Sequence, residues 1–174
     1  MGLVHIYCGD GKGKTSAAVG LAVRAAGCGK RVVIARFLKT DNSGEVEILK
    51  KIPEVTLIPC RKTFGFVRSM DEETKRECAA YHRELFGEAV KLAEHADLVV
   101  FDEIMAAVNY GMVPERDVLE FLENRPGRDQ TDGLEIVLTG RDPSEKLIAA
   151  ADYVSELCTR KNQFDTGIME PTGV

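Results

Sequence analysis

Short apolar runs alternate along the chain with segments whose hydrophobic residues recur at helical spacing. The runs are rich in Val, Ile and Leu and have the length of buried β-strands. They cover residues 3–7, 31–37, 55–58, 98–103 and 134–138. This regular alternation predicts an α/β fold in which helices flank a mostly parallel sheet and make three layers.

The segments between the strands carry the start and stop signals of helices. Alanines and leucines at helical spacing follow residue 16, and Gly27 and Gly29 then stop that helix. Pro114 is a residue typical of a helix start, and residues 125–127 break the helix that follows it. Helices are therefore expected after residue 16, at 45–51, after Asp71 and after Pro114, with a polar turn at 39–44.

The helix predicted after Asp71 is the longest of the chain. Asp71 suits the capping position, and two acidic residues follow it at the positive end of the helix dipole. One apolar stripe on this helix predicts its core-facing side, and it consists of Cys78, Tyr81, Leu85, Ala89 and Leu92. Cys78 is then a small hydrophobic residue rather than a nucleophile. His82 lies off the stripe and is expected at the surface rather than as a ligand.

Length and composition limit the kind of protein this is. With 174 residues and 44% hydrophobic content, the chain fits one domain over residues 1–174. It has neither an apolar run of about eighteen residues nor an export signal, so we expect a cytoplasmic protein without membrane contact. The net charge of −5 argues against a nucleic-acid partner. Five scattered cysteines, none in a C-x-x-C pair, indicate neither a disulfide framework nor a zinc site.

A glycine-rich loop follows the first predicted strand and is the most informative motif of the chain. It resembles a phosphate-binding loop, in which backbone N–H groups surround a polyphosphate, a lysine adds charge and a hydroxyl binds Mg²⁺. The residues predicted to bind ATP here are Gly9, Asp10, Gly11, Lys12, Gly13, Lys14, Thr15 and Ser16. Cys8 departs from the motif, which usually begins with glycine. The alternative, an ordinary surface turn, is disfavoured because a strand precedes the loop and a helix follows it.

Two carboxylates, Asp102 and Glu103, end the fourth apolar run. In phosphate-loop proteins an acid at this place is directed at the metal opposite the loop hydroxyl. Ligands of parallel sheets gather at the carboxyl ends of the strands, where both motifs lie. The predicted metal ligands are therefore Thr15, Asp102 and Glu103, for Mg²⁺ or Mn²⁺, with Glu103 able to orient a nucleophile instead.

Two basic features have an open interpretation. Arg141 follows the fifth predicted strand and either meets phosphate oxygens or pairs with a surface acid. Arg61 and Lys62 lie in a segment that also contains Phe66 and Arg68, and such a segment is by itself typical of a solvated basic loop.

Many short stretches in register make the chain resemble the ATP:corrinoid adenosyltransferase family of phosphate-loop proteins. The matching residues are 9–18, 24–25, 27–30, 37–39, 44–45, 65–66, 102–104, 125–126, 139–141, 151–152, 155–156, 164–165 and 167–168. The resemblance implies a phosphate-loop NTPase fold with RecA-like architecture. It also adds Arg24 to the residues expected to bind ATP.

The activity that this resemblance implies is transfer of the 5′-deoxyadenosyl group of ATP to Co(I) of a corrinoid, with release of triphosphate. Lys14 and Arg141 would stabilise the charge on the leaving triphosphate. Phe66 would press on the corrinoid and displace its lower axial ligand. Lys14, Glu103 and Phe66 are thus the catalytic candidates. The resemblance also implies a flavoprotein or flavin as electron donor, and a homodimer.

The chain departs from the family pattern at several positions. Arg68 stands where relatives carry Trp, so Phe66 and Arg68 are the corrinoid-binding candidates, with one aromatic ring in place of two. The chain lacks the N-terminal helical extension of some relatives. Two alternative functions share the loop and the metal acids: a small phosphate-loop kinase, and a binding protein in which ATP switches a surface for a partner.

Overall fold

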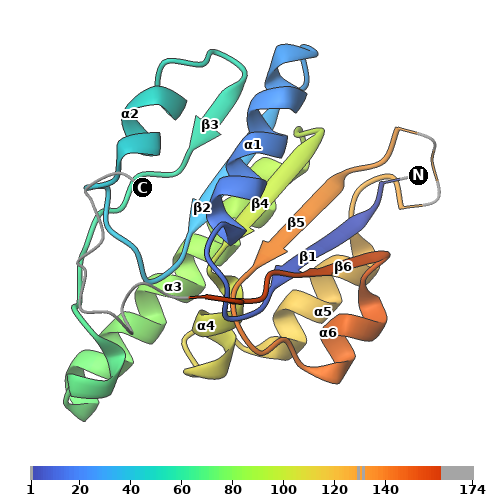
Figure 1. Ribbon diagram of the computed structural model, residues 1–174. Coiled ribbons are helices and arrows are strands. Elements are labelled where there is room, and N and C mark those ends of the chain that lie inside the picture. Colours follow the sequence, from blue (N-terminus) through green and yellow to red (C-terminus); the bar gives the residue numbers. More distant parts are fainter. Residues whose placement is uncertain (1, 129, 131, 162–174) are drawn as a thin grey trace.

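Six parallel strands form one sheet through the middle of the protein (Figure 1). The computed structural model describes residues 2–128, 130 and 132–161. The strands are β1 (Val4–Cys8), β2 (Val32–Arg36), β3 (Val55–Leu57), β4 (Leu98–Asp102), β5 (Glu135–Thr139) and β6 (Tyr153–Glu156). They lie in the order β3-β2-β4-β5-β1-β6. Because all run the same way, their carboxyl ends meet at one edge of the sheet.

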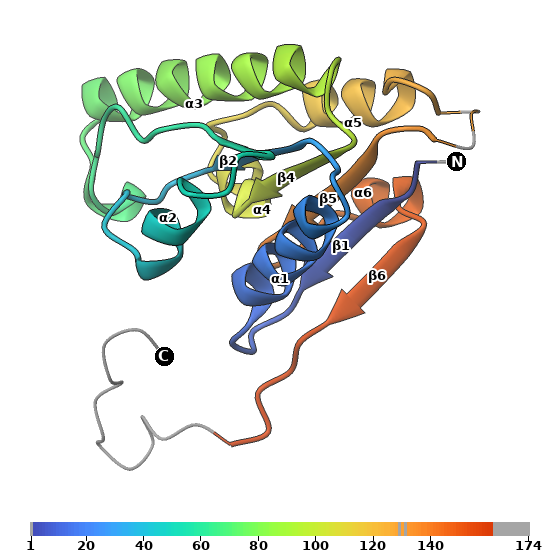
Figure 2. The ribbon, with the colours of Figure 1, turned by 90° about the horizontal axis from the view of Figure 1, so that it is seen from above.

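Helices cover both faces of this sheet and give the three predicted layers (Figure 2). They are α1 (Lys14–Gly27), α2 (Gly44–Leu49), α3 (Glu72–Ala93), α4 (Ile104–Asn109), α5 (Glu115–Asn124) and α6 (Glu145–Ala150), with a short 3₁₀ helix at Val67–Ser69. The α/β fold with a parallel sheet is confirmed. No helix within the described residues is long and apolar enough to cross a membrane.

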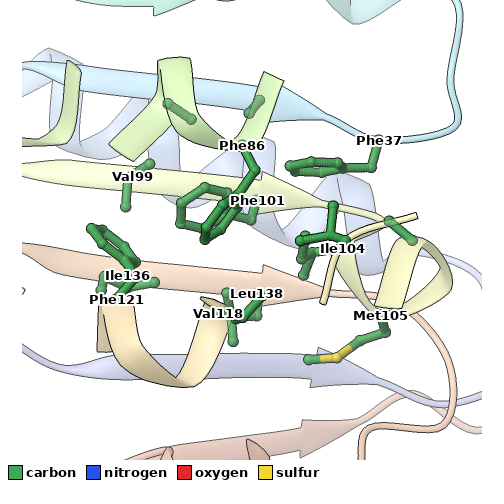
Figure 3. Close-up of a cluster of buried hydrophobic side chains, with 14 of the residues drawn as sticks. Phe37, Phe86, Val99, Phe101, Ile104, Met105, Val118, Phe121, Ile136 and Leu138 are labelled. Carbon is green, nitrogen blue, oxygen red and sulfur yellow. The ribbon is translucent and has the colours of Figure 1, made fainter. Parts of the chain in front are cut away.

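Alternate residues along β1, β2, β4 and β5 enter two separate cores, as the period of a β-strand requires. On one face the small side chains Ala18, Ala22 and Ala26 bring α1 close to the sheet. On the other face four phenylalanines join the sheet to α3 and α5 (Figure 3). The centroid of the Phe101 ring lies 5.4 Å from that of Phe86 and 5.6 Å from that of Phe121. This second, larger core fixes the carboxyl end of β4 in place.

The predicted elements are present, with bounds shifted by one to three residues. Asp71 caps α3 as expected, because its side chain accepts a hydrogen bond of 2.8 Å from the backbone N–H of Thr74. Four elements escaped the sequence analysis: α4, α6, β6 and the short 3₁₀ helix at Val67–Ser69. Helices α4 and α6 have six residues each, too few for a clear helical period, and every residue of β6 is exposed at the sheet edge.

Two predictions for α3 are wrong. His82 is 3% exposed rather than at the surface, because it packs between Phe37, Phe64 and Tyr81. Leu92 is 36% exposed although it was placed on the buried stripe. The buried stripe of α3 continues from Ala89 to Ala93, four residues later, so Leu92 lies at its edge rather than within it.

Candidate functional site

The glycine-rich loop between β1 and α1 packs directly on the chain that follows β6. The backbone N–H of Gly11 donates a 2.7 Å hydrogen bond to the carbonyl of Leu157. A Cβ atom added to Gly9 would lie 2.3 Å from that same oxygen, and one added to Gly11 would lie 2.6 Å from it. Only glycine fits at both positions. Gly13 precedes α1 with φ of 106°, a conformation that favours glycine.

The side chain of Lys14 closes over this loop. Its Nζ atom donates to the carbonyl oxygens of Gly9 and Gly11, at 2.8 and 2.7 Å. Arg141 reaches the same loop from the end of β5, with its Nη2 atom 3.5 Å from the carbonyl oxygen of Asp10. Two cations therefore lie at the loop where an anion would bind.

Asp102, at the end of β4, is the centre of a buried polar network. It is 2% exposed, and its Oδ1 atom accepts hydrogen bonds from the hydroxyls of Thr15 at 3.0 Å and Thr139 at 2.7 Å. The Nζ atom of Lys39 donates to Asp102 Oδ2 at 2.5 Å and to Thr15 Oγ1 at 2.6 Å. The structure thus brings Thr15 and Asp102, both predicted from sequence, into direct contact. Lys39 was missed because its segment reads as a polar turn.

Glu103 has an unusual backbone conformation, and two other residues share it. The described non-glycine residues with positive φ are Leu38 (53°), Glu103 (63°) and Asp142 (51°). All three line one cleft, just beyond the carboxyl ends of β2, β4 and β5. The left-handed region costs a non-glycine residue free energy, and such strain concentrates at functional sites. The backbone N–H of Glu103 is held by the hydroxyl of Thr139 at 2.8 Å.

This cleft has a volume of about 910 Å³ and lies between the phosphate loop and the segment before α3. Its lining includes the basic residues Lys14, Lys39, Arg68 and Arg141, the acids Glu103 and Asp142, and the aromatics Phe66 and Tyr110. Four cations thus face two carboxylates in a chain whose net charge is −5. The cleft is therefore suited to a ligand that is both anionic and partly apolar.

Phe66 is 87% exposed at one wall of the cleft, an unusual position for a phenylalanine. The residues before it are firmly attached to α3. Phe64 packs on Tyr81 with ring centroids 5.6 Å apart. Arg61 binds both carboxylate oxygens of Glu88, at 2.6 and 2.8 Å, which lowers the pKa of Glu88. Arg61 thus forms a surface ion pair with Glu88, while residues 65–68 line the cleft.

Of the predicted ATP-binding residues, Lys14 and Arg141 line the cleft, whereas Arg24 lies far from it. It lies in the last turn of α1, exposed, ten residues beyond Lys14 or about 15 Å along the helix axis. Besides Lys39, the cleft residues that the sequence did not single out include Tyr110 and Asn109. The side-chain amide of Asn109 donates to the carbonyls of Arg141 and Asp142, both at 3.2 Å. Asn109 and Tyr110 belong to the end of α4, which the sequence did not reveal. The resembling stretches at 164–165 and 167–168 lie outside the described residues.

Comparison with known proteins gives consistent matches over the full chain. A family model described as "ATP:corrinoid adenosyltransferase BtuR/CobO/CobP" matches residues 1–174. A protein of Escherichia coli K12 named corrinoid adenosyltransferase is 34% identical over 176 residues, covering 99% of this chain and 85% of its own length. Corrinoid adenosyltransferase CobA of Salmonella typhimurium LT2 is also 34% identical, with the same two coverages.

A corrinoid adenosyltransferase of Pseudomonas aeruginosa is 30% identical, covering 99% of this chain and 83% of its own length. Among solved structures, the Aeropyrum pernix ORC2 protein in its ADP form matches with a TM-score of 0.40 and 19% identity. The match covers 91% of this chain and 43% of that one. At this TM-score the likeness adds nothing to the assignment.

Proposed function

Because the chain belongs to the ATP:corrinoid adenosyltransferase family, we propose that it transfers the 5′-deoxyadenosyl group of ATP to Co(I) of a corrinoid. The electron pair of Co(I) attacks C5′ of ATP, the C5′–O bond breaks, and triphosphate leaves. The observation that supports this best is the composition of the cleft, in which the phosphate loop and its cations lie across from the exposed ring of Phe66.

The phosphate-loop side of the cleft is suited to hold triphosphate as a leaving group. Negative charge accumulates on that group as the C5′–O bond breaks, so fixed cations and N–H groups lower the barrier. Lys14 and Arg141 already lie at the loop. In this proposal no side chain acts as a nucleophile, and the protein contributes positioning and electrostatics.

The same side of the cleft fits Mg²⁺ or Mn²⁺. Among the residues that the structure describes, no three His, Cys, Asp or Glu side chains cluster as a metal cage. Mg²⁺ commonly binds through one or two protein oxygens, with waters and substrate phosphates completing its shell. Thr15 Oγ1 and Asp102 Oδ1 would hold it, with Glu103 nearby in the cleft wall. When bound, the ion neutralises charge on the triphosphate.

The opposite side of the cleft is suited to the corrinoid. We assign Phe66 to contact with the corrin ring, because an exposed phenylalanine gains free energy when an apolar surface covers it. Arg68 belongs to the same wall and presents a positive charge where relatives carry an aromatic ring. Which corrinoid is preferred then depends on Phe66 and Arg68 together.

The remaining expectations belong to the same proposal. They are one domain over residues 1–174, a homodimer, a flavoprotein or flavin that reduces the corrinoid, and a place in the cytoplasm for corrinoid synthesis or salvage.

An anaerobic assay tests the proposal. The protein is incubated with Mg²⁺-ATP, cob(II)alamin and a chemical reductant, the corrinoid spectrum is followed, and the phosphate products are separated. We expect photolabile adenosylcobalamin and one triphosphate for each adenosyl group transferred. Lys14→Ala is the inactive reference. ADP with a phosphorylated acceptor would instead identify a kinase, and ATP binding without turnover on any corrinoid would identify a switch protein.

A further inference from the structure

The ammonium group of Lys39 lies between the two side chains that would hold the metal ion. Its Nζ atom is 2.6 Å from Thr15 Oγ1 and 2.5 Å from Asp102 Oδ2. Thr15 comes from α1, Asp102 from the end of β4, and Lys39 from the chain after β2. Three separate elements thus meet at one point, and a positive charge occupies it.

Burial explains why a cation is needed there when no metal is bound. Asp102 is 2% exposed, and a carboxylate without a compensating charge is unfavourable in such a place. Its partners among the described residues are the hydroxyls of Thr15 and Thr139 and the ammonium of Lys39. Only Lys39 brings a positive charge, so Lys39 is what keeps Asp102 compensated.

The ammonium and a metal ion exclude each other at this point. Mg²⁺ requires its ligand oxygens at about 2.0–2.1 Å, and Nζ of Lys39 already donates to one of the two proposed ligand atoms, Thr15 Oγ1, and to the other oxygen of the Asp102 carboxylate. A metal ion held by Thr15 and Asp102 would lie beside a second positive charge that contacts the same two side chains, so the metal is favoured only if Nζ leaves. Lys39 has a flexible four-carbon stem, is partly exposed and lines the cleft that also contains Lys14 and Arg141. A triphosphate bound in that cleft would offer anionic oxygens as new acceptors for Nζ.

We propose that Lys39 is a positioning residue with two places: it holds Thr15 and Asp102 in the nucleotide-free chain, and it moves onto the triphosphate when metal and ATP bind. Lys39 therefore keeps the metal ligands in register and lowers the affinity for metal alone. Metal binding at Thr15 and Asp102 is thereby coupled to ATP binding. The inference rests on the metal-ATP part of the proposed function and not on the corrinoid step.

Metal binding to the full chain tests this, with Mn²⁺ as the probe and the electron paramagnetic resonance of free Mn²⁺ as the readout. Lys39→Met keeps the length of the stem and removes the charge. Without nucleotide, we expect Lys39→Met to bind Mn²⁺ about tenfold more tightly than the unaltered chain. With Mn²⁺ present, we expect it to bind ATP about tenfold more weakly, because a charged hydrogen bond to phosphate is lost. Lys146→Met, at an exposed position on α6, is the matched control and should change neither value.

The opposite signs of the two effects distinguish this role from a purely structural one. A lysine that only supports the site would, when replaced, weaken Mn²⁺ binding both with and without ATP, and that result overturns the proposal. Equal Mn²⁺ affinity of Lys39→Met and the unaltered chain overturns it as well. Adenosyl transfer enters neither measurement, so failure of the proposed activity remains a separate result.

If Lys39→Met does not fold, the unaltered chain still decides the question. A short pulse of reductive methylation, quantified by mass spectrometry, reports how accessible Lys39 Nζ is, with Lys146 as the reference in the same sample. We expect labelling of Lys39 to rise with saturating Mn²⁺ alone and to fall when ATP is added. Labelling that is the same under all three conditions contradicts the proposal.

Discussion

The two walls of the cleft are built in opposite ways. On the phosphate-loop side, Lys14 is hydrogen-bonded to backbone carbonyls of the loop, and Thr15 is hydrogen-bonded to Asp102. On the other side, Phe66 projects 87% exposed from a segment whose earlier residues are fixed to α3. One wall consists of polar side chains that already have hydrogen-bond partners, and the other presents an exposed aromatic ring beside Arg68.

This difference indicates what each wall contributes to the proposed reaction. Preorganised charges stabilise a transition state because they need no rearrangement when charge develops. An exposed ring gains its free energy only when a partner covers it. Changes to the first wall should therefore reduce the rate with every corrinoid. The effect of changes to the second wall should depend on the oxidation state in which the corrinoid is supplied, Co(II) or Co(I).

The largest effect is expected from Lys14→Ala. Loss of one donor to a developing anion costs about 10²–10³-fold in kcat, and we expect that loss for adenosyl transfer to any corrinoid. The measurement is the initial rate of adenosylcobalamin formation under anaerobic conditions, with cob(I)alamin and with cobinamide. A loss confined to one corrinoid would contradict the division between the two walls. Lys146→Ala, remote from the cleft, is the control.

The phosphate-loop wall could be predicted almost entirely from the sequence, because its chemistry is local. Gly9 to Thr15 are consecutive, and Asp102 directly ends a buried strand. Parallel strands then bring both to one edge of the sheet. Lys39 was out of reach because its role depends on a contact with Thr15, 24 positions earlier, and with Asp102, 63 positions later.

The opposite wall was predicted less completely. Phe66 and Arg68 came from the family resemblance, whereas an exposed phenylalanine cannot be distinguished from a buried one by its neighbours in sequence. Tyr110 was missed because the helix before it has only six residues. His82 was placed wrongly because periodicity on α3 counts only apolar residues, whereas His82 is buried by aromatic rings from two other segments.

The protein should lose stability in acid because of His82, which packs against Phe64 in the segment before Phe66. Burial lowers the pKa of His82 to about 4, whereas the unfolded chain has the ordinary value of 6.5. As the pH falls from 6.5 to 4, the unfolded state takes up a proton at this residue and the folded state does not. Stability is therefore lost across that window, by up to roughly 3 kcal/mol, and the contribution is constant below it.

Denaturant unfolding at pH 7 and at pH 4.5 measures this effect of His82. His82→Phe has a ring of similar size without a titrating group, so its loss of stability between the two pH values should be smaller than that of the unaltered chain. His95→Phe is the comparison variant, because it also replaces a histidine but lies in the turn after α3. An equal loss of stability in His82→Phe and the unaltered chain would show that other groups cause the acid sensitivity.

The next effect concerns Phe66 itself. Burying a phenylalanine is worth about 1.5–3 kcal/mol, so Phe66→Ala should lose roughly tenfold to hundredfold in kcat/KM with cob(II)alamin and a reductant. With cob(I)alamin reduced beforehand the loss should be smaller, because displacement of the lower ligand is then no longer needed. Thermal melting should be unchanged, since the ring is exposed. Full activity of Phe66→Ala with cob(II)alamin would remove Phe66 from the proposed site.

The smallest effect is expected at Arg68, the position at which the family resemblance predicts an aromatic ring. Replacing it with tryptophan adds a second ring beside Phe66, and an aromatic contact of this kind contributes about 0.5–1.5 kcal/mol. Arg68→Trp should therefore raise kcat/KM with cob(II)alamin by about twofold to tenfold, while Arg68→Ala, which removes the charge without adding a ring, should not. An equal gain in both variants would mean that the positive charge, and not the missing ring, limits the reaction. In that case the second wall would also act through electrostatics, and the contrast between the two walls would hold for Phe66 alone.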